Sequence, residues 1–80
     1  MNMNIPEPII EALEEIMTFV GETNDWMVIK KLVLRSIPPA LRTNFSTRHP
    51  KTKKQSLNEF EMIVIDWWEA RTGRRLQLLK

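Results

Sequence analysis

Basic side chains are the groups in this sequence whose type and spacing point most clearly to a chemistry. Five of them fall within thirteen residues that contain no acid: Arg42, Arg48, Lys51, Lys53 and Lys54. A second group, Arg71, Arg74 and Arg75, follows near the end of the chain. Clustered guanidinium and ammonium groups neutralise nucleic-acid phosphates without reading bases. The pattern therefore predicts DNA or RNA as a partner, held mainly by its backbone.

Charge is distributed unevenly along the chain, although the net charge is only +2. Residues 1–25 carry six acids and no base, whereas residues 26–80 carry all twelve lysines and arginines against four acids. Such asymmetry is typical of a protein with a polyanionic partner. The alternative is that the two oppositely charged parts attract each other within the fold.

Groups that could support catalysis or bind a metal are scarce. The chain has no cysteine, and its one histidine, His49, stands among lysines in the basic segment. Glu11, Glu14 and Glu15 have helical spacing and could bind a hard cation, but such a cluster is usually a solvated helix face. Two glycines are too few for a phosphate-cradling loop. We therefore expect no catalytic residue, cofactor, metal or small-molecule substrate, and no enzymatic activity.

Apolar residues on an otherwise polar helix face suggest a second function. Met62 and Ile65 interrupt the acidic face of the helix expected near the C-terminus, and Trp68 lies at the edge of its apolar face. Methionine and tryptophan are enriched in interface cores. The alternative prediction is therefore that this protein is an adaptor or inhibitor that docks on a protein partner through these three residues, or that it self-associates as a homodimer. Scattered surface apolar residues are also ordinary.

The elements that must position these groups are helices. Apolar residues repeat at helical spacing over residues 7–20, after two prolines that suit a first turn. A second helix is expected over residues 25–37, with Asn24 or Asp25 as its cap and the Pro38–Pro39 pair ending it. Residues 42–56 are expected to form a long basic loop, with one short helical turn between Pro39 and Phe45.

The third helix is expected over residues 57–72. Ser56 and Glu59 have capping-box spacing, and Gly73 follows the last turn. Leu57, Phe60, Ile63, Val64, Trp67, Trp68 and Ala70 form its predicted apolar arc; Asn58, Glu59, Glu61, Asp66 and Glu69 form its polar face. A partly buried Asp66 would need Lys30 or Arg35 as a partner; otherwise it is solvated. The tail after Gly73 could be a strand, a helical turn or an arm.

These elements predict an all-α fold: a small three-helix bundle in one domain, residues 1–80, with a long basic loop between helices two and three. The longest apolar stretches are far shorter than the about 20 residues that cross a bilayer, so no membrane association is expected. The absence of a basic segment followed by an apolar block predicts no signal peptide. A cytoplasmic location is the default expectation.

Overall fold

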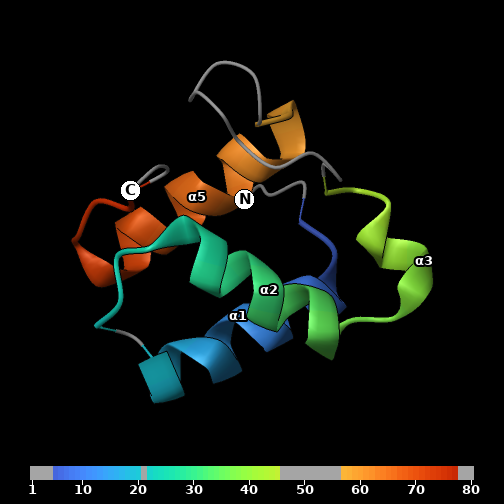
Figure 1. Cartoon of the computed structure of the whole chain (residues 1–80), viewed down its shortest axis with the longest axis horizontal. Helices are drawn as coiled ribbons and strands as arrows, with labels where there is room; N and C mark the ends of the chain where they lie inside the picture. Colours follow the sequence, from blue (N-terminus) through green and yellow to red (C-terminus); the bar gives the residue numbers. More distant parts are fainter. Residues whose placement is uncertain (1–4, 21, 46–56, 78–80) are drawn as a thin grey trace.

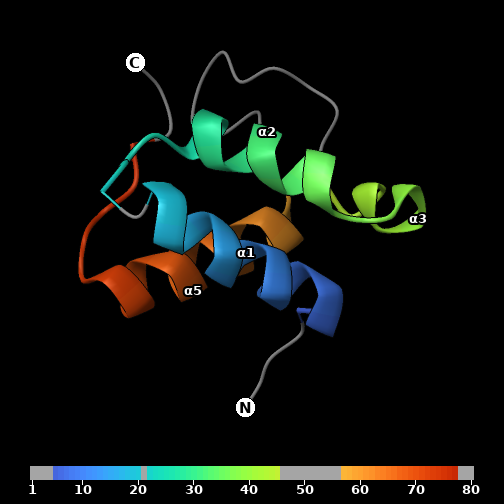
Figure 2. The ribbon, with the colours of Figure 1, turned by 90° about the horizontal axis from the view of Figure 1, so that it is seen from below.

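The computed structural model describes residues 5–20, 22–45 and 57–77, and these residues form an all-α fold. Their helices are α1 (Glu7–Val20), α2 (Trp26–Ser36), α3 (Pro39–Arg42) and α5 (Glu59–Thr72). Helix α2 runs back along α1, and α5 runs in the same general direction as α1 (Figures 1 and 2). Among the described residues, no helix is both long and apolar enough to cross a bilayer.

Helix α1 has the predicted bounds. The Pro6 carbonyl accepts hydrogen bonds from the Ile9 and Ile10 amides at 3.0 and 3.1 Å, which starts the helix immediately after the proline. One face is buried, with Ile9, Ala12, Leu13 and Ile16 in the core. Burial of this apolar face, rather than helix propensity, supplies most of the stability of such a helix.

Helix α2 begins and ends for the reasons that its sequence indicates. Asp25 is the N-cap, and its carboxylate accepts a hydrogen bond from the Met27 amide at 3.0 Å. Ile37 is extended because a proline follows it. Pro38 then caps α3, the short helical turn predicted in this connection. The core side of α2 carries Trp26, Ile29 and Val33 together with the ammonium-bearing Lys30.

Helix α5 begins two residues later than predicted, so the capping box was assigned to the wrong residues. Asn58, not Ser56, is the N-cap: its Oδ1 accepts from the Glu61 amide at 2.7 Å, and the Glu61 carboxylate accepts from the Asn58 amide at 3.1 Å. Both spacings fit the motif, and local sequence does not choose between them. Helix α5 ends at Gly73, whose φ of 73° is the left-handed conformation that glycine favours.

The tail after α5 packs against the corner between α1 and α2. Leu76 is buried, and its amide donates to the Glu69 carboxylate at 2.7 Å. Gln77 forms an isolated parallel bridge with Asp25, and its carbonyl accepts from the Trp26 amide at 2.9 Å. Of the three alternatives for the tail, residues 74–77 therefore come nearest to the strand, although one bridge is not a strand.

Candidate functional site

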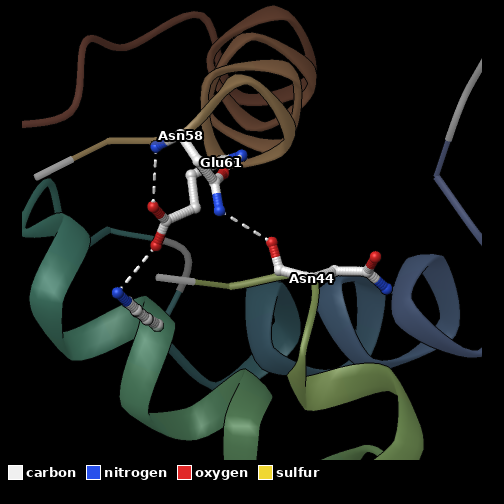
Figure 3. Close-up of polar contacts among 4 residues, drawn as sticks. Asn44, Asn58 and Glu61 are labelled. Atoms are coloured by element: carbon white, nitrogen blue, oxygen red, sulfur yellow. Dashed lines mark hydrogen bonds and ion pairs between the residues drawn. The ribbon is translucent and has the colours of Figure 1, made fainter. Parts of the chain in front are cut away.

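The predicted basic loop falls largely outside the described residues. Arg48, Lys51, Lys53 and Lys54 lie there, as does His49. The residues on either side of that segment are described and meet each other. The side-chain Nδ2 of Asn58 donates to the Asn44 backbone carbonyl at 2.9 Å, and the rings of Phe45 and Phe60 pack edge to face with centroids 5.3 Å apart. Figure 3 shows Asn58 directed towards Asn44.

Arg42 is exposed, but its guanidinium already has a partner. Its Nε donates to the Leu34 carbonyl at 2.8 Å, which ties α3 to the last turn of α2. Lysine and arginine near a helix C-terminus commonly satisfy such carbonyls. Helix α3, which carries Arg42, lies at the opposite end of the molecule from the C-terminal end of α5 (Figures 1 and 2). The structure therefore does not bring Arg42 together with the C-terminal arginines.

The C-terminal arginines are brought together with α1. Arg71 forms an ion pair with Glu14, Nη2 to Oε2 3.2 Å, and its guanidinium lies over the Trp67 ring, 4.9 Å from the centroid. Arg74 donates from Nη1 to the Glu22 carbonyl at 3.1 Å. Arg75 is exposed. Both contacts join the N-terminal part of the chain to the C-terminal part, and the Arg71–Glu14 pair is of the kind expected if opposite charges attract within the fold.

A cleft of about 460 Å³ lies beside these arginines. Its walls come from the last turn of α1, the last turn of α5 and the residues that follow each helix: Met17, Thr18, Phe19, Val20, Glu22, Arg71, Thr72 and Arg74. Phe19 is 79% exposed, the largest exposed fraction among the exposed large hydrophobic residues of the described chain. The cleft thus combines an uncovered aromatic ring with two guanidinium groups.

The predicted docking surface on α5 is wrong. Met62 is 54% exposed, but Ile65 and Trp68 are only 7% and 1% exposed and belong to the core. The buried stripe of α5 is Glu61, Val64, Ile65 and Trp68. This stripe is rotated about the helix axis from the predicted apolar arc. The prediction placed Glu61 on the polar face, whereas the structure buries it. A lone exposed Met62 is an ordinary surface residue.

A buried ion pair between α2 and α5 is the polar feature that the sequence interpretation missed. Lys30 Nζ lies 2.7 Å from Glu61 Oε2, with side chains 7% and 0% exposed. Glu61 Oε1 caps α5, so one carboxylate serves both contacts (Figure 3). Buried charges require such partners. Lys30 could have been found, because at i+4 from Trp26 and i−3 from Val33 it falls within the buried arc.

The acidic side chains that the structure describes point to separate surroundings. Glu11, Glu14 and Glu15 are exposed on α1, and Glu14 is paired with Arg71. Over residues 5–20, 22–45 and 57–77, no three histidine, cysteine, aspartate or glutamate side chains converge as metal ligands would. Asp66 is exposed, and Lys30, which was considered as its partner, pairs with Glu61 instead.

Comparison of the chain with protein families, with curated proteins and with solved structures gives no match.

Proposed function

We propose that this protein is a non-enzymatic regulatory or accessory protein that binds the backbone of DNA or RNA. The observation that carries the proposal is the charge pattern: five basic residues and no acid between residues 42 and 54, with three further arginines at residues 71, 74 and 75. Each phosphate that such a cation neutralises releases a counterion, and this release supplies the affinity.

The outer faces of the helices limit how nucleic acid could be bound. The exposed face of α1 carries Glu7, Glu11, Glu14 and Glu15, and the exposed face of α5 carries Glu59 and Asp66. An acidic helix would be repelled from a groove lined by phosphates. We therefore assign binding to the basic segment and the C-terminal arginines, with contacts to phosphate rather than to base edges.

Salt titration with matched variants tests this function. Fluorescence anisotropy with labelled oligonucleotides should give weak binding whose log affinity falls against log salt with a slope of about −4 to −5 for five or six contacts. Lys51→Ala with Lys53→Ala and Lys54→Ala should weaken binding to all sequences alike and flatten the slope by up to about three units. Lys31→Ala with Arg35→Ala, on exposed α2 positions, is the control and should have a smaller effect.

Absence of binding at low salt with tens of micromolar protein would reject this function. So would a triple variant that binds as tightly as the unchanged protein with the same salt slope.

A second candidate function is the docking of a protein partner. A shallow groove of about 500 Å³ on α2, lined by Val28, Lys31, Leu32, Leu34 and Arg35, favours it. Three apolar residues beside two bases suit an amphipathic acidic segment. Val28→Glu should abolish capture of such a partner while leaving oligonucleotide binding intact. Self-association as a homodimer also stays a prediction, and so does a cytoplasmic location.

A further inference from the structure

An uncovered aromatic ring beside two arginines distinguishes the cleft at the C-terminal ends of α1 and α5. Phe19 lines this cleft with 79% of its surface exposed, although it follows Ile16 and Met17 on an amphipathic helix whose apolar face is otherwise covered. Its ring therefore contributes little to the core. An exposed ring can stack on a flat ligand, and stacking does not depend on which base is present.

The two arginines of the cleft are held in place before any ligand arrives. Arg71 lies over the Trp67 ring, and Arg74 donates to the Glu22 carbonyl. A guanidinium that is already oriented loses little side-chain entropy when it contacts a phosphate. The cleft thus offers a stacking surface and preorganised positive charge within one small volume.

We propose that this cleft binds a nucleotide of a single-stranded nucleic acid, with its base stacked on Phe19 and its phosphate beside Arg71 and Arg74. The inference rests on the proposed nucleic-acid function and deepens it by naming the strand state. In a duplex the bases are already stacked and paired, so Phe19 has no free face to cover.

Glu14 is the local competitor of the phosphate. It pairs with Arg71, but both side chains are about half exposed, at 48% and 50%. Exposed ion pairs contribute little to stability, since solvent and salt screen them. A phosphate can therefore replace the Glu14 carboxylate on Arg71 at small cost. Until it does, Glu14 competes with the phosphate and lowers the affinity for nucleic acid.

Phenylalanine variants test the stacking contact. Anisotropy would be measured with a 12-mer of thymidine as a single strand and with a duplex of the same length. Phe19→Ala should weaken single-strand binding by about 5- to 150-fold, the equivalent of about 1–3 kcal/mol per stacked base. It should leave duplex binding unchanged, and Phe19→Trp should retain single-strand affinity. Thermal unfolding should be nearly unaltered, because the ring is exposed.

Glutamate variants test the competition. Glu14→Gln should raise single-strand affinity by up to about fivefold, because it frees Arg71. Glu11→Gln removes the same charge from the same helix without touching Arg71, so it is the matched control and should change affinity less.

The outcomes separate the two proposals. The proposed nucleotide site in the cleft would be rejected if Glu14→Gln and Glu11→Gln had equal effects. It would also be rejected if Phe19→Ala bound the single strand as tightly as the unchanged protein. Neither result would reject binding to the nucleic-acid backbone elsewhere on the molecule. Failure of both oligonucleotides to bind at low salt would overturn both.

Discussion

At the scale of single residues, the ion pair of Lys30 and Glu61 is the contact with the largest expected effect on stability. Removing one partner leaves the other charge buried and uncompensated, which typically costs about 3–5 kcal/mol. Lys30→Met alone and Glu61→Gln alone should each destabilise the fold strongly. The double variant should cost less than the sum of the two, because Gln can still accept from the Asn58 amide and no unpaired charge remains.

Urea unfolding of the four proteins measures this coupling. Lys31→Met, a lysine of the same helix on its exposed face, is the control and should change the free energy of unfolding by no more than about 0.5 kcal/mol. Additive single effects would show that the charges do not interact.

The corrected placement of Ile65 and Met62 gives a second prediction. Ile65→Lys forces an ammonium group into the core or pulls that part of α5 open, so the free energy of unfolding should fall by several kcal/mol. Met62→Lys adds the same charge three residues away at an exposed position and should change stability by about 0.5 kcal/mol or less. Equal melting temperatures for the two variants would contradict the observed burial.

At the scale of elements, two overlapping capping boxes are possible at the start of α5, and substitutions can distinguish them. Asn58→Ala removes the N-cap and the bond to the Asn44 carbonyl, and it should cost about 0.5–2 kcal/mol. Ser56→Ala should be nearly neutral, because Asn58 supplies the cap. The two variants would be compared by thermal unfolding. A larger fall in melting temperature for Ser56→Ala than for Asn58→Ala would show that Ser56, and not Asn58, is the N-cap of α5.

At the scale of the whole molecule, the tail connects α5 to the corner between α1 and α2. Leu76 is buried there although it lies outside any helix, so Leu76→Ala should destabilise the fold by about 2–5 kcal/mol. Arg75→Ala, a neighbouring exposed position, should change stability much less. If denaturant unfolding gives the same midpoint for both, the docking of the tail contributes nothing to the fold.

The charge distribution also acts at this scale. The Glu14–Arg71 pair brings opposite charges of the two chain halves together between α1 and α5, and Arg74 donates to the backbone carbonyl of Glu22 just after α1. The described arginines are therefore structural as well as candidate phosphate contacts. Nucleic-acid binding through them competes with contacts that they already make, so weak and salt-sensitive affinity is the natural expectation.

Local sequence by itself determined the helices. The apolar period and paired prolines define α1, while Asp25 and Pro38 define the two ends of α2; these signals act through backbone atoms only a few residues away. Gly73 ends α5 for the same reason.

Only the tertiary structure decided which face of α5 is buried and which residue caps it. Glu61 can enter the core because Lys30, thirty-one positions earlier, supplies the opposite charge. Glu61 shares the buried face of α5 with Val64, Ile65 and Trp68, whereas Met62 lies outside that face. Hydrophobic periodicity treats a glutamate as an outward-facing residue, since the cost of burying a charge is offset only by a partner that the local pattern does not contain.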